Sequence, residues 1–80
     1  MVRAKFRCTE ETTFLGYAFK DGKMTASILY RYKFSPVAAD SPENAKFYEA
    51  TPSGTLELAT LKEKMFEVGK EYYLDITPSL

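Results

Sequence analysis

The chain has 80 residues, no histidine and a single cysteine, Cys8, and its eleven basic side chains balance eleven acidic ones. The lack of histidine removes the commonest acid–base group, and one thiol supports neither a disulfide nor the usual tetrahedral zinc site within one chain. Such a short chain forms one domain, residues 1–80, and buries only about 60% of its unfolded surface. We therefore expect a non-enzymatic protein without cofactor or metal, stabilised by aromatic packing or by forming a homo-oligomer.

The charges are divided between the two halves of the chain. Residues 1–35 carry seven basic side chains against three acids, whereas residues 36–80 carry four lysines against eight acids. This asymmetry indicates either an interaction surface or opposite charges that pair inside one small domain. Pairing is the simpler interpretation, because opposite charges are common cross-strand neighbours in sheets.

The first twenty residues predict two strands. Residues 2–9 alternate strictly, with Ala4, Phe6 and Cys8 on one face, and this is typical of a half-buried strand. The polar sequence TEET at residues 9–12 then indicates a turn. Residues 12–20 predict a second strand, and Asp21-Gly22 is a strong hairpin signal.

Residues 23–35 contain the longest alternation in the chain and predict a third strand. It ends at Pro36, which cannot donate to a strand ladder. The apolar members of the alternation share one face: Met24, Ala26, Ile28, Tyr30, Tyr32 and Phe34.

Residues 35–54 separate this strand from the rest of the chain and predict a short helix. Ser41-Pro42-Glu43 combines an N-cap hydroxyl, a proline at the first helical position and an acid in the first turn. The helix would continue from Asn44 to Ala50, and the sequence TPSG at residues 51–54 would end it. Two more strands follow at residues 55–61 and 70–77, with one helical turn between them at residues 61–66.

These elements predict a mainly β domain, a small five-stranded curled sheet or barrel with one short helix between strands three and four. This is the element order of the OB-fold, so an OB-like barrel is one candidate.

The residues that could carry chemistry are basic and aromatic. Cys8 lies on the apolar face of the first strand, where a buried thiol behaves as a small hydrophobe. Neighbouring first and third strands would place five basic side chains on one surface, a candidate nucleic-acid-binding set, while the tyrosines of strand three alternate to the other face. Zero net charge does not favour strong binding to phosphates. The set is Arg3, Lys5, Arg7, Arg31 and Lys33.

The C-terminal half resembles a group of small uncharacterised proteins encoded by tailed bacteriophages and prophages. The resemblance is carried by Ser35-Pro36-Val37, by SPEN and Phe47 in residues 41–47, by TPSG and the leucines in residues 51–58, and by FEVGKEYYLDITP at residues 66–78. It implies a phage origin and expression in the cytoplasm of the bacterial host. It implies no activity, catalytic residue or cofactor.

From these observations we expect a phage accessory protein that binds a host macromolecule or a small ligand, with counter-defence as one such role. Alternatives are an OB-like single-stranded nucleic-acid-binding protein, an oligomer that sequesters a ligand between subunits, and a minor phage structural protein. No apolar run is long enough to span a membrane. The candidate partner-binding residues are the polar side chains after the third strand: Ser41, Glu43, Asn44, Tyr48, Thr51 and Ser53.

Overall fold

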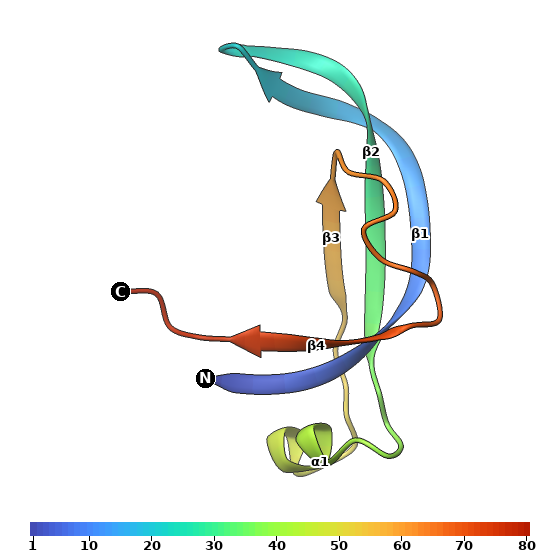
Figure 1. Cartoon of the computed structure of the whole chain (residues 1–80), viewed down its shortest axis with the longest axis vertical. Helices are drawn as coiled ribbons and strands as arrows, with labels where there is room; N and C mark the ends of the chain where they lie inside the picture. Colours follow the sequence, from blue (N-terminus) through green and yellow to red (C-terminus); the bar gives the residue numbers. More distant parts are fainter.

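The computed structural model describes residues 1–80 as one curled antiparallel sheet with a short helix (Figure 1). The strand order is β3-β2-β1-β4. The predicted mainly β fold with one short helix is confirmed, but the prediction of five strands is wrong, since there are four, and an OB-like barrel is not confirmed. The elements are β1 Val2–Lys20, β2 Lys23–Pro36, α1 Pro42–Tyr48, β3 Leu56–Thr60 and β4 Glu71–Ile76.

The missing strand boundary lies in β1, where the predicted turn at residues 9–12 does not form. Cys8 pairs with Phe34 and Glu10 pairs with Lys33, so Thr9 is one extra residue in β1. Its hydroxyl donates to the carbonyl of Lys33 at 3.2 Å. A bulge of this kind lets a strand continue while changing which residues face the core. On the side of the sheet that carries the core, the residues of β1 are therefore even-numbered before Thr9 and odd-numbered after it.

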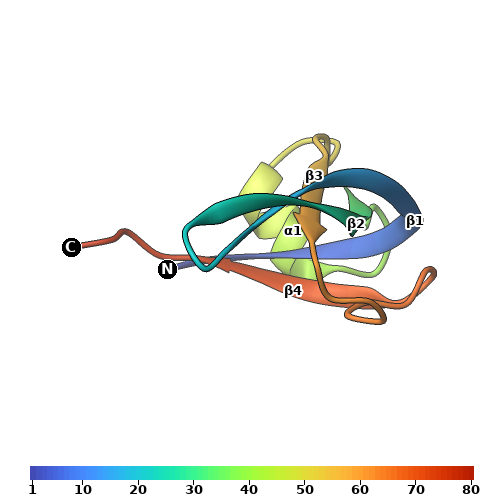
Figure 2. The ribbon, with the colours of Figure 1, turned by 90° about the horizontal axis from the view of Figure 1, so that it is seen from above.

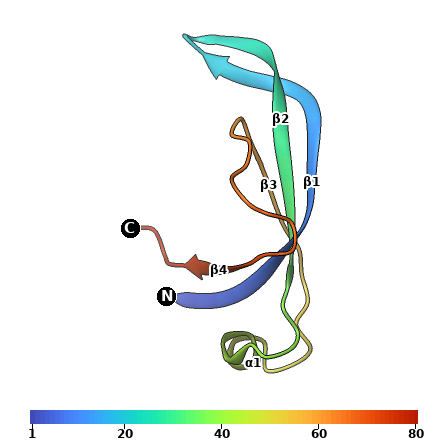
Figure 3. The same ribbon diagram turned by 45° about the vertical axis from the view of Figure 1, so that its right-hand side comes forward.

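The β1–β2 hairpin extends beyond the rest of the sheet. β4 pairs only with residues 2–7 of β1, and β3 pairs only with residues 30–34 of β2. Residues 14–29 therefore form a two-stranded ribbon, here called the arm, which projects at the upper end of Figures 1 and 3. The arm raises the radius of gyration to 15.3 Å, where a compact chain of this length has about 12 Å.

The predicted hairpin at Asp21-Gly22 forms the tip of the arm. Both residues have positive φ, 50° and 75°, as a two-residue type I′ turn requires.

The sheet is strongly twisted. Its edge strands β3 and β4 therefore run in very different directions (Figures 1 and 2).

The core lies at the body end of the sheet. Five side chains from β1 and β2 are buried there: Ala4, Phe6, Cys8, Tyr32 and Phe34. The connection between β3 and β4 covers them through Phe66, whose ring makes edge contacts with Tyr32 and Phe34 at centroid distances of 5.2 and 5.0 Å. The Tyr32 hydroxyl anchors this connection by donating to the carbonyl of Lys62 and accepting from the amide of Met65, both at 3.3 Å. The helical turn predicted at residues 61–66 is absent, and turns take its place.

The helix begins as predicted. Ser41 is the N-cap, its hydroxyl accepts from the amide of Asn44 at 3.3 Å, and Pro42 opens the first turn. The helix ends at Tyr48, two residues before the predicted end, because Glu49 adopts the left-handed conformation, with φ of 51°. The chain has no helix of the length and apolar character that crossing a bilayer requires.

Candidate functional site

The five predicted basic residues lie on one face of the sheet, the face opposite the core. They share it because β1 and β2 are adjacent and their register places these side chains on the same side. Four of the five are already paired with carboxylates. Three of these pairs join the basic first half of the chain to the acidic second half, as the simpler interpretation of the charge division expects. The pairs are Arg3–Asp75 at 2.7 Å, Arg7–Glu71 at 2.6 Å, Arg31–Glu57 at 2.9 Å and Lys33–Glu10 at 3.7 Å.

Aromatic rings on the same face hold some of these cations in place. Arg3 and Lys5 lie over the ring of Tyr73, with charge-to-centroid distances of 4.8 and 5.3 Å. Arg31 lies 4.3 Å from the ring centre of Phe14. Because the rings face cations of the same chain, they are not free platforms for stacking bases.

Two of the predicted partner-binding residues are used inside the protein. Asn44 is 1% exposed, and its side-chain amide pairs with the backbone of β1. Its oxygen accepts from the amide of Lys5 at 2.6 Å, and its nitrogen donates to the carbonyls of Lys5 and Val37 at 2.7 and 2.8 Å. The Asn44 side chain thus makes hydrogen bonds to the backbone of β1 of the kind that a neighbouring strand would make, at the point where β2 has ended. Ser41 is buried as the helix cap.

The other four predicted residues reach the surface to different degrees. Glu43 is half-buried and accepts from the hydroxyl of Tyr73 at 3.0 Å. Hydrogen bonds from its own backbone amide and then from Tyr73 hold the pKa of the Glu43 carboxyl below its ordinary value. Tyr48 is half-buried, whereas Thr51 and Ser53 are exposed.

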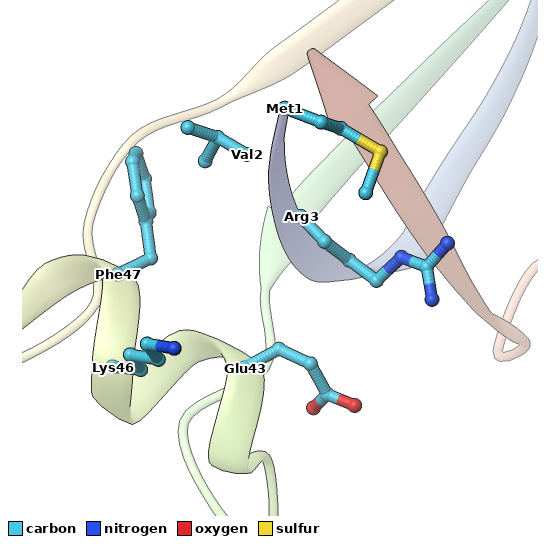
Figure 4. A pocket seen from close by; sticks show the side chains of 6 residues that line it. All are labelled: Met1, Val2, Arg3, Glu43, Lys46 and Phe47. Atoms are coloured by element: carbon cyan, nitrogen blue, oxygen red, sulfur yellow. The ribbon is translucent and has the colours of Figure 1, made fainter. Parts of the chain in front are cut away.

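A cleft of about 410 Å³ lies between the N-terminal end of β1 and α1 (Figure 4). It brings together a residue from each predicted set, Arg3 and Glu43. Lys46 also lines it and belongs to none of the five ion pairs. Three apolar side chains, Met1, Val2 and Phe47, complete the lining. Sequence reasoning missed this cleft because Val2 and Phe47 meet only through the tertiary fold.

A second candidate surface is the apolar side of the arm, here called the arm face. It consists of Leu15, Tyr17 and Phe19 on β1 and their cross-strand partners Ile28, Ala26 and Met24 on β2. Its five large side chains are between 54% and 73% exposed. The sequence predicted strands at residues 12–20 and 23–35, but not that the apolar side of their hairpin would lie uncovered.

Comparison with protein-family models, with curated proteins and with solved structures gives no match.

Proposed function

We propose that this protein is a non-enzymatic accessory protein of a bacteriophage or prophage, which acts in the bacterial cytoplasm by binding a host protein, with counter-defence as its role. The resemblance of the C-terminal half supports the phage origin. The observation that carries the binding function is the cleft between β1 and α1, because it brings one residue of each predicted set, Arg3 and Glu43, together beside three apolar side chains (Figure 4).

The chemistry of the cleft fits a segment of a protein that carries one apolar side chain beside an acidic group. Its volume of about 410 Å³ lies within the roughly 300–1,000 Å³ of ligand-binding clefts. Phe47, which is 47% exposed, offers apolar area. Arg3 is already paired with Asp75, and the Glu43 carboxylate accepts a hydrogen bond from Tyr73, so Lys46 is the cation of the lining that is left to meet a carboxylate.

A capture experiment from host lysate tests this function. The full-length protein is immobilised, and proteins retained by wild type are compared with those retained by Phe47→Asp and Lys46→Glu. The control is Val68→Asp, the same kind of change at a 58% exposed position on the β3–β4 connection. We expect a partner that wild type and Val68→Asp retain and both cleft variants lose. A partner retained equally by all four proteins, or no partner together with no phenotype on deletion, would refute the proposal.

Single-stranded nucleic-acid binding is less well supported. Four of its five candidate cations form ion pairs within the chain, and affinity for phosphates requires cations that can replace counterions. We expect no binding of a labelled oligonucleotide at low salt; salt-dependent binding that Arg31→Gln with Lys33→Gln abolishes would favour this function instead. A place in the virion would be revealed by mass spectrometry of purified particles.

A further inference from the structure

The arm face continues the core-facing side of the sheet. Because of the bulge at Thr9, the odd-numbered residues of the arm in β1 point to the same side as Phe6 and Cys8. At the body end this side is covered by Phe66 and the β3–β4 connection. Nothing in the chain covers it beyond that point, although the side chains are as large and apolar as those of the core.

The backbone of the arm is equally unpartnered. Residues 14–20 of β1 and 23–29 of β2 pair only with each other, so both outer edges lack a neighbouring strand. A two-stranded hairpin is marginally stable in water, and uncovered strand edges invite pairing with another chain. The arm therefore has the features of an element that is completed by association.

The size of the arm face fits a second copy of the same chain. Aromatic side chains contribute about 150–250 Å² each when uncovered, and if the aliphatic ones are placed at the lower end of this range, five side chains that are more than half exposed present roughly 600 Å². This is near the upper limit of about 300–600 Å² for the largest patch on a monomer. Two arm faces together reach about 1,200 Å², where the range of stable, specific interfaces begins.

The charges around the arm face indicate the orientation of the two copies. Glu11, opposite Tyr32, lies on the same side of the sheet at the base of the arm, and it forms no ion pair. Lys20 and Lys23 face each other across the tip, on the opposite face of the ribbon from Phe19 and Met24, and neither forms an ion pair; at the narrow tip their long side chains can reach round to the arm face. An antiparallel two-fold pairing places the tip of each arm at the base of the other. Lys20 and Lys23 of each copy then lie near Glu11 of the other copy.

We propose that the protein forms a two-fold symmetric homodimer in which two arm faces pack against each other in antiparallel orientation. This proposal does not depend on the proposed function, because it uses none of the residues of the cleft. The large side chains that it buries are Leu15, Tyr17, Phe19, Met24 and Ile28.

The first test is the mass in solution, measured by sedimentation over a range of concentrations. We expect twice the 9.1 kDa of one chain. Met24→Asp buries a carboxylate without a partner and should raise the dimer dissociation constant about 100-fold or more. The matched control is Thr25→Asp, the neighbouring exposed residue on the opposite face of the same strand, which should leave the dimer intact. Circular dichroism of both variants checks that the sheet is retained.

The second test uses charge reversal and keeps the proposal testable if Met24→Asp does not fold. Glu11→Lys alone, or Lys20→Glu with Lys23→Glu, should weaken the dimer, and the three changes together should restore it. A wild-type protein that remains a monomer at high concentration, an assembly other than a dimer, equal effects of Met24→Asp and Thr25→Asp, or no restoration by the combined charge reversal would overturn the proposal.

Discussion

Asn44 provides the sharpest test of how the helix is joined to the sheet. The residue occupies the first turn of α1, where the helix dipole favours an acid by about 0.3–1 kcal/mol. On helix chemistry alone, Asn44→Asp should therefore be neutral or stabilising. The structure predicts the opposite, because the Asn44 side-chain nitrogen donates to the carbonyls of Lys5 and Val37, and a carboxylate has no proton to donate.

The expected loss follows from burial. With the side chain 1% exposed, Asn44→Asp places a charge against two carbonyl oxygens, and a buried charge without compensation costs about 3–5 kcal/mol. Asn44→Ala removes the same hydrogen bonds without adding charge, so we expect about 2–4 kcal/mol. A domain of this size has only about 4–12 kcal/mol of stability in total, so either change is severe.

Urea unfolding at constant protein concentration, followed by circular dichroism, measures both effects. For a small domain with a slope of about 1.3 kcal/mol per molar urea, the midpoint for Asn44→Asp should fall by about 2–4 M. Lys46→Ala, an exposed change in the same helix, is the control and should shift the midpoint little. The reasoning is refuted if Asn44→Asp is as stable as wild type or more stable than Asn44→Ala.

Three further predictions concern the core and one surface ion pair. Phe66→Ala removes the ring that covers the core and should cost about 3 kcal/mol in the same urea assay. Burial raises the pKa of the Cys8 thiol, so an aromatic disulfide reagent should modify it far more slowly in the native protein than in urea; equal rates would contradict its burial. The hydrogen bond from Arg3 lowers the pKa of the Asp75 carboxyl, so this pair stabilises the fold above the ordinary aspartate pKa and is lost as pH falls through the lowered value. Carbon NMR titration should find the pKa of Asp75 back at its ordinary value in Arg3→Gln.

Local signals in the sequence correctly predicted the turn at the tip of the arm and the start of the helix. Asp21-Gly22 supplies the two positive φ angles of a tight hairpin, and Ser41-Pro42 supplies a cap and a fixed φ. These features depend on residues close in the chain. The polar residues 9–12 were misread for the same reason, because TEET satisfies turn preferences locally. Only the cross-strand partner Lys33, far away in the sequence, shows that Glu10 lies in a continuous strand.

Periodicity predicted which way side chains point but not what covers them. The alternation from Met24 to Phe34 assigns its apolar residues to one face, and the register agrees. Phe34 is 2% exposed and Met24 is 64% exposed, because Phe66 reaches only one end of that face. The position of Phe66 depends on the path of the β3–β4 connection. The alternation of apolar and polar residues in a strand gives no information about that path. The bridging role of Asn44 was missed for the same reason, since its partners lie on β1 and beyond the end of β2.

The two proposed surfaces lie at opposite ends of a molecule whose longest extent is 45 Å, with the arm at one end and α1 at the other (Figure 1). Antiparallel pairing of the arms therefore places two clefts at the far ends of the dimer, where each can bind its own partner. A dimer of this form binds an immobilised partner through both clefts, and linked binding can strengthen retention by about 10²–10⁴ without a new contact. Met24→Asp should thus shorten residence on a densely coated surface while leaving the affinity of a single cleft in solution unchanged. Phe47→Asp should weaken both measurements and leave the mass of the dimer unaltered. If Met24→Asp changed the affinity of a single cleft, the two surfaces could not be independent.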